Sequence, residues 1–392
     1  MELAPSARAA IPAFLVLFAL FTPASIAGAH LSLGVAVLLL ALDPEGRAKA
    51  AALARTHPLR WPIAAWIVAS VLAVALAIDP AGSAEKLKKL ALLVLLPLGA
   101  LPQVRRAIRP IMGTLIGATA IVAAWGLGAH VAAGGGLEQR LHGISGFYMT
   151  VAAILMVVAL LVIGEFLAAL RAPSTRRVVF LSVCGAVILV ALLATYTRGS
   201  WVGFALGALW LFRRRWTALL SLAVVAGLFF VLGPADARDR VLSIFDPHHP
   251  RNAERLLIWR HGVSLVAERP IFGAGLVIPA EIMEHEVVTP DGTIRVHSHM
   301  HNAFLQIAVS MGLPALAVFA WWMVELFRAA GRAARHTIRN LWEEGLVLAY
   351  PAILVALLAN GLFEWNFGDS EVLGLLYLLT GCLLGVETGA ES

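Results

Sequence analysis

Three alternating histidines precede an apolar stretch that begins near residue 302. An imidazole titrates near neutral pH, so it can act as a general base or bind a metal. On a strand, His297, His299 and His301 would share a face, but this segment runs into a helix, and no cysteine or pair of carboxylates accompanies it. We therefore predict no metal and no cofactor, interpret His297 and His299 as polar loop residues, and assign His301 as a catalytic base. Asn302 is expected either to orient a substrate or to cap the helix.

Arginines at two places in the chain have the chemistry to hold an anion, because the planar guanidinium group matches the oxygens of a phosphate. Arg198 lies in a short polar segment between two apolar stretches. Arg255 and Arg260 belong to an amphipathic helical stretch, in which Arg255 and Trp259 are four residues apart and share one face. We expect these arginines to bind a lipid phosphate at the membrane surface. The alternatives are a snorkelling anchor for Arg198 and a surface helix on lipid headgroups for the other two.

A pair of lysines, Lys86 and Lys89, precedes the apolar stretch 90–104. The two residues are three positions apart, so they share a face of a helix. We expect them to add positive charge for a phosphorylated lipid, and the alternative is contact with ordinary headgroups.

The composition indicates that most of the chain lies in lipid. Of the 392 residues, 60% are apolar and 14% are charged, and the mean hydropathy is +0.84. A soluble fold of this size could not bury so much apolar surface, which excludes a cytosolic enzyme, a secreted disulfide scaffold, a disordered protein and a sequence-specific DNA-binding protein. The net charge of +6 does not indicate nucleic acid, because the basic residues form short runs between apolar stretches. Cys184 and Cys382 lie inside such stretches, so we expect no disulfide.

Twelve apolar stretches are candidates for membrane spans. They are 10–24, 26–42, 61–78, 90–104, 110–133, 144–170, 178–196, 199–212, 216–233, 302–327, 345–363 and 371–387. The first two are expected to form an uncleaved hairpin rather than a signal peptide. We therefore predict an all-α integral membrane protein with spans one to nine in 1–233, one large structured loop in 234–301 and spans ten to twelve in 302–392.

The basic residues predict the orientation of these spans. With the N-terminus in the cytoplasm, 18 of the 30 Lys and Arg residues fall in cytoplasmic segments and 5 in short outer loops. The other seven lie in the loop 234–301, on the outer side, together with seven of the twelve histidines and nine acidic residues. A patterned loop of this length is usually functional. No charged residue lies convincingly at mid-membrane, which argues against an ion-coupled transporter.

Three motifs resemble those of the O-antigen ligase and polymerase superfamily of bacterial inner-membrane glycosyltransferases. They are Thr197-Arg198-Gly199-Ser200-Trp201, Arg255-x-x-x-Trp259 with Pro270-x-Phe272-Gly273-x-Gly275, and His301-Asn302 followed by Gly312. The small residue usual after that last glycine is here Ala315, a mild departure. The resemblance covers most of the chain as topology. The three motifs occur in order around the one large outer loop.

This resemblance implies a GT-C-like fold and a direct transfer on the periplasmic face of the inner membrane. A glycan moves from undecaprenyl pyrophosphate to an acceptor hydroxyl, which in the ligases belongs to a sugar of the lipid A core. The pyrophosphate is then expected to bind Lys86, Lys89, Arg198, Arg255 and Arg260. His301 would be the base and Asn302 would orient the acceptor, with membrane lipids but no nucleic acid as partners.

The number of outer loops favours a ligase within this superfamily. An O-antigen polymerase, which often carries two sizeable outer loops, is the first alternative. A protein O-oligosaccharyltransferase of the same superfamily is the second. A non-enzymatic lipid or glycan transporter is less favoured, because Arg and His cluster on one face while the spans are chemically quiet.

Overall fold

Helices make up most of the structure, because the apolar stretches contain few helix breakers and a chain in lipid must bond its backbone groups internally. The computed structural model describes residues 3–144, 147–217, 220, 227, 230–231, 235–243, 246, 250–278, 286–289, 292–295 and 299–389. Its first helical segments are α1 (Leu3–Phe21), α2 (Ile26–Ala41), α3 (Pro44–Thr56), α4 (Arg60–Ala75), α5 (Pro80–Ala84), η1 (Glu85–Val94), α6 (Leu95–Gly99), α7 (Pro102–Arg106) and α8 (Ile108–Ala132). They are followed by α9 (Tyr148–Ala169), α10 (Thr175–Ala194), α11 (Arg198–Phe212), α13 (Ala235–Leu242), α14 (Pro250–Glu268), α16 (Ala303–Ala333), α17 (Leu341–Asn360), η2 (Asn366–Gly368) and α18 (Ser370–Glu387).

Six helices among the described residues are long and apolar enough to cross a membrane, namely α8, α9, α10, α16, α17 and α18. The pair α2 and α3, bent by 104°, would add a seventh, and α1 and α4 contain shorter apolar helices. The chain is therefore a multi-pass membrane protein. The count of twelve spans stays a prediction, and the predicted span 216–233 lies mostly outside the described residues. The predicted span 90–104 is not one helix but a succession of η1, α6 and α7.

Close helix packing in the bundle depends on small residues. On α11, a Cβ at Gly203 or Gly207 would approach the backbone carbonyl of Ala356 or Ala352 on α17 to within 2.8 Å. Such positions let helix backbones meet where lipid supplies no hydrophobic driving force. Helices α9 and α18 are buried along nearly their whole lengths, so they form the centre of the bundle.

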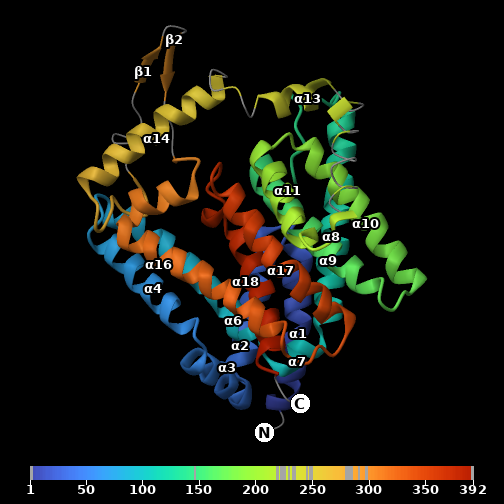
Figure 1. The fold of residues 1–392 in the computed structure, drawn as a ribbon. Coiled ribbons are helices and arrows are strands. Elements are labelled where there is room, and N and C mark those ends of the chain that lie inside the picture. The colour runs from blue at the N-terminus through green and yellow to red at the C-terminus, as the bar shows by residue number, and fades with distance from the viewer. Residues whose placement is uncertain are drawn as a thin grey trace.

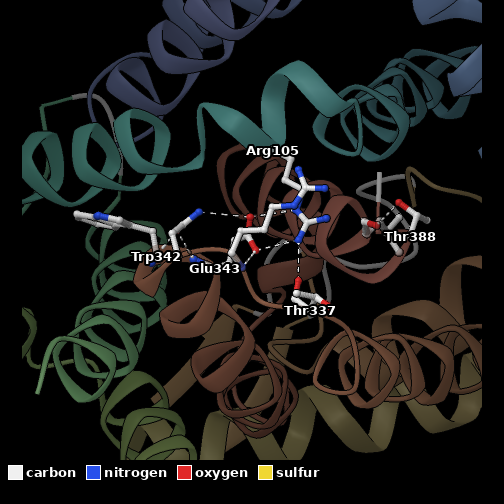
Figure 2. A network of polar contacts seen from close by, with 8 residues as sticks. Arg105, Thr337, Trp342, Glu343 and Thr388 are labelled. Carbon is white, nitrogen blue, oxygen red and sulfur yellow. Dashed lines mark hydrogen bonds and ion pairs between the residues drawn. The ribbon is translucent and has the colours of Figure 1, made fainter. Parts of the chain in front are cut away.

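The start of α1 and the end of α18 lie at the same end of the bundle (Figure 1), which we call the termini end. Figure 2 shows a buried ion pair there, between Arg105 of α7 and Glu343 of α17. Arg105 donates from Nε and Nη2 to the two carboxylate oxygens at 3.0 Å, and from Nη2 to the carbonyl of Thr337 at 2.9 Å. A second buried carboxylate, Glu165, pairs with Arg177 at 2.5 Å. The first pair joins segments distant in sequence, and the second joins the consecutive helices α9 and α10.

At the opposite end, the loop end, α13 and α14 lie across the bundle below a β-hairpin (Figure 1). Strands β1 (Glu286–Thr289) and β2 (Gly292–Arg295) pair antiparallel, with Glu286 opposite Arg295. The hairpin is a small addition to a structure that is otherwise helical, in agreement with the predicted all-α class. Its segment is rich in Val, Ile and Thr, which favour strands.

Candidate functional site

The predicted base His301 lies at the loop end, directly before α16. Its backbone has φ of 44°, the left-handed conformation that side-chain-bearing residues rarely adopt. The next residue, Asn302, is the N-cap of α16 and accepts from the backbone N–H groups of Phe304 and Leu305 at 3.0 Å. Of the two alternatives for Asn302, the helix cap is the one that the structure contains.

The short loop around His301 is held from both sides. Trp259 of α14 donates from Nε1 to the carbonyl of Met300 at 2.9 Å, and Gln306 of α16 accepts from the Met300 N–H at 2.9 Å. The His301 N–H also donates to Nδ1 of His299 at 3.2 Å, and the two imidazole rings lie 4.1 Å apart. The tryptophan of the Arg-x-x-x-Trp motif therefore positions the histidine loop, a role that its sequence pattern does not indicate. His297 lies outside the described residues.

A carboxylate that sequence reasoning missed completes this cluster. Glu364 follows α17 in the turn before η2, and its Oε2 lies 3.3 Å from Nδ1 of His301. Its Oε1 lies 3.8 Å from Nε2 of His299. In the sequence, no cysteine or pair of carboxylates accompanies the histidines, whereas the structure brings a single carboxylate to them from 63 residues further along the chain. One acidic residue at the outer end of a predicted span was the signal in the sequence.

The electrostatics of the cluster follow from partial burial. Burial alone would raise the pKa of Glu364, but the hydrogen bond with His301 and the charges of both histidines lower it below its usual value. Burial, together with the nearby His301 and Arg255, lowers the pKa of His299 to about 4. His299 is therefore neutral at pH 7. One ligand atom from each of the three residues lies within 4.8 Å of the others, so the cluster has the geometry to hold a metal ion.

Arg198 and Arg255 lie together at the loop end. A small cavity of about 20 Å³, the arginine pocket, is lined by both of them and by Arg240, Arg140 and Glu364. Arginines from four separate segments thus line one small cavity, to which Glu364 of the histidine cluster also contributes. Tyr148, Asn360 and Phe363 complete much of its wall.

Arg198 has hydrogen-bond partners that are neutral groups of neighbouring segments. Its side chain is 8% exposed and donates to the carbonyl of Ser243 at 2.7 Å and to Oδ1 of Asn252 at 2.7 Å. Arg240 likewise donates from Nε to the carbonyl of Tyr196 at 3.1 Å. Arg198 therefore also fastens α14 and the preceding segment to the bundle.

Lys86 and Lys89 lie elsewhere. They line a larger cavity of about 390 Å³, the lysine cavity, to which none of the four arginines contributes. The wall of this cavity also includes His299, Trp365 and Asp369. Arg260 is exposed on α14 and lines neither cavity. The five cationic residues expected at one pyrophosphate are thus divided among three places.

The glycine motifs let the backbone around Gly273 and Gly275 hydrogen-bond to the backbone of α16 near Gly312, a contact that we call the backbone splice. Gly312 breaks α16 with φ of +84°, and Gly273 has φ of +71°. The N–H groups of Ala274 and Gly275 donate to the carbonyls of Val309 and Ser310, at 2.7 and 3.0 Å. A Cβ at Gly312 would overlap the backbone of Ile271, so these two glycines allow the segments to touch. The splice therefore ties the loop to α16 at the break around Gly312.

Comparison with known proteins gives a match to the part of the chain that contains His301 and three of the four arginines of the arginine pocket. A search of curated proteins finds no match to the chain. Residues 183–320, which contain Arg198, Arg255 and His301, match the family model described as O-antigen ligase. This agrees with the resemblance of the three motifs, and over these residues the match supports membership of the O-antigen ligase family.

Proposed function

We propose that the protein is an O-antigen ligase that transfers a glycan from undecaprenyl pyrophosphate to a sugar hydroxyl of the lipid A core. The single observation that carries the proposal is that Glu364 contacts His301 and also lines the arginine pocket. The proposed base and the proposed anion-binding arginines are therefore both next to the same side chain, that of Glu364. Transfer from a lipid pyrophosphate requires this combination.

In the proposed step, the oxygen of the acceptor hydroxyl forms a bond to the anomeric carbon of the donor sugar. The bond from that carbon to the pyrophosphate oxygen breaks, and its electron pair leaves with the pyrophosphate. Arg198 and Arg255 stabilise the negative charge that develops there. The hydroxyl proton passes to Nε2 of His301, because Nδ1 faces the carboxylate of Glu364.

The setting of this reaction rests on charge and family. The short-loop bias of 18 basic residues against 5 puts the termini end in the cytoplasm and the loop end in the periplasm. The proposed donor is a lipid of the bacterial inner membrane, and the proposed active site, which lies at the loop end, would face the periplasm. No metal enters the step.

Reconstituted protein with radiolabelled donor and lipid A core tests the reaction. Label on lipid A supports a ligase, whereas longer glycan on the carrier lipid would identify a polymerase. Label on a protein acceptor would identify an O-oligosaccharyltransferase. Label that crosses the membrane unchanged would identify a transporter and refute the proposal.

Variants of the histidines test the assignment of the base. A general base contributes roughly 10²–10⁴-fold to a rate, so His301→Ala should reduce turnover by about this factor while donor binding is kept. His299→Ala should have a much smaller effect. Activity should survive excess chelator. Loss of activity in chelator, restored by one divalent metal, would replace the free base by a metal held between His299, His301 and Glu364.

A further inference from the structure

We propose that the lysine cavity is the acceptor site, and that Lys86 and Lys89 hold a phosphate group carried by the acceptor saccharide. This inference rests on the proposed function and names the acceptor chemistry. It departs from the assignment of the two lysines to the pyrophosphate of the donor.

The first support is the position of the cavity relative to the arginine pocket. His299 lines the lysine cavity, and Glu364 lines the arginine pocket. These two residues belong to one cluster, with Oε1 of Glu364 3.8 Å from Nε2 of His299. The two cavities therefore approach the histidine cluster through different residues. A two-substrate transfer requires separate sites that meet at the reacting groups, so a donor among the arginines leaves the lysine cavity for the acceptor.

The second support is the way in which the lysines are presented. Residues 85–94 form a 3₁₀ helix, in which side chains three positions apart eclipse each other. Lys86 and Lys89 therefore lie in one row along the cavity wall, beside Leu87 and Leu90. The neighbouring Lys88 is exposed and does not line the cavity. Lys89 is half-buried and donates to the carbonyl of Gly368, so its ammonium group is held at the cavity.

The third support is the chemistry of the other walls. Four aromatic side chains line the cavity, from Trp66, Trp365, Phe367 and Tyr377. Flat aromatic faces, together with the polar Gln306 and Ser310, suit a sugar ring that exposes C–H groups and hydroxyls. The volume of about 390 Å³ falls within the range of about 300–1,000 Å³ of small-molecule sites. Among the described residues of the wall, Asp369 is the one acidic group, and it already accepts from Oγ1 of Thr150 at 2.8 Å.

The test compares acceptors with and without their anionic groups. Lipid A core and the same material after phosphatase treatment are titrated against wild-type protein and the variants Lys86→Gln, Lys89→Gln and Lys88→Gln. The acceptor KM should rise about tenfold or more in the first two variants, while the donor KM stays unchanged. Lys88→Gln, which removes the same charge from the same segment, should behave as wild type. Phosphatase treatment should raise the wild-type KM and remove the difference between wild type and Lys86→Gln.

Direct binding of the acceptor, measured without donor, separates this inference from the proposed reaction. Binding of phosphorylated core that depends on Lys86 supports the acceptor site, even where no transfer occurs and the proposed reaction fails. Equal binding by Lys86→Gln and Lys88→Gln overturns the inference while leaving the reaction intact. The difference in binding between wild type and Lys86→Gln could instead depend on the fraction of anionic phospholipid in the vesicles and not on the acceptor phosphate. That result would assign the lysines to lipid headgroups and would also overturn the inference. Lys86 is exposed, so its substitution should not disturb folding.

Discussion

Substitution of Glu364 by glutamine tests the contact on which the proposed chemistry depends. Glutamine keeps the shape of the side chain and an acceptor oxygen, but it removes the charge that faces Nδ1 of His301 at 3.3 Å. A hydrogen bond to a charged group contributes about 1.5–3 kcal/mol and a neutral one about 0.5–1.5 kcal/mol, so the substitution should cost about 1–1.5 kcal/mol in the transition state. Because about 1.4 kcal/mol corresponds to a factor of ten, kcat should fall about tenfold.

The alanine variant removes the whole contact and should therefore have the larger effect. Glu364→Ala should reduce kcat by roughly tenfold to a hundredfold, since it loses the full contribution of about 1.5–3 kcal/mol. The donor KM should stay within about twofold in both variants, because the arginines and not Glu364 hold the pyrophosphate. Glu371, in the first turn of α18, provides a matched control, and Glu371→Gln should leave kcat unchanged.

The assay is initial-rate transfer of labelled glycan to lipid A core in proteoliposomes, with folding checked by thermal unfolding in detergent. A fall in kcat with unchanged donor KM and unchanged melting temperature supports an orienting role for Glu364. Full activity of folded Glu364→Ala would refute it. A rise in donor KM at unchanged kcat would instead assign Glu364 to the arginine pocket alone.

Three further predictions concern stability, measured as the midpoint of thermal unfolding. Gly312→Ala should destabilise the protein by more than about 1 kcal/mol and should also lower activity. Alanine is strained at φ of +84°, and its Cβ would overlap the backbone of Ile271. A variant as stable as wild type would contradict the backbone splice. Burial, with Glu371 and Glu364 nearby, raises the pKa of Asp369 to about 6. The stability that the protonated carboxyl contributes is therefore present at low pH and is lost as the pH rises from about 4 through 6. Asp369→Asn should therefore gain stability relative to wild type across that window, by at most about 3 kcal/mol, and a constant difference at all pH values would contradict this. Glu343→Ala, which leaves Arg105 buried without its partner, should cost about 3–5 kcal/mol without changing the donor KM of the protein that folds.

Local patterns in the sequence predicted the helices well, because each apolar stretch carries its own information. The boundaries of α9, α16 and α18 fall close to the predicted spans 144–170, 302–327 and 371–387. The stretch 90–104 was predicted less well. Its residues have the composition of a span, but the chain winds there as a 3₁₀ helix and two short α-helices, and hydropathy does not distinguish these windings.

The candidate site was predictable only where its residues lie in motifs. His301 and Arg255 could be named from neighbouring residues, but Glu364 reaches the cluster only through the packing of α17. The role of Trp259 is similar, because the carbonyl that it contacts lies 41 residues away. Lys86 was also assigned from sequence to the same phosphate as the arginines, because a sequence shows the charge of a residue but not which cavity the residue lines.

The winding of η1 sets the length of one wall of the lysine cavity. Ten residues of a 3₁₀ helix rise about 2.0 Å each and reach roughly 20 Å, whereas the same residues in an α-helix would reach roughly 15 Å. Rewinding would also turn Lys89 about 60° away from Lys86, because three residues cover about 300° of an α-helix. The rise per residue in this segment thus determines the distance between its two ends. Substitutions that favour the α form at the exposed positions Glu85 and Lys88 should shorten the wall and separate the lysines without altering any residue that faces the cavity.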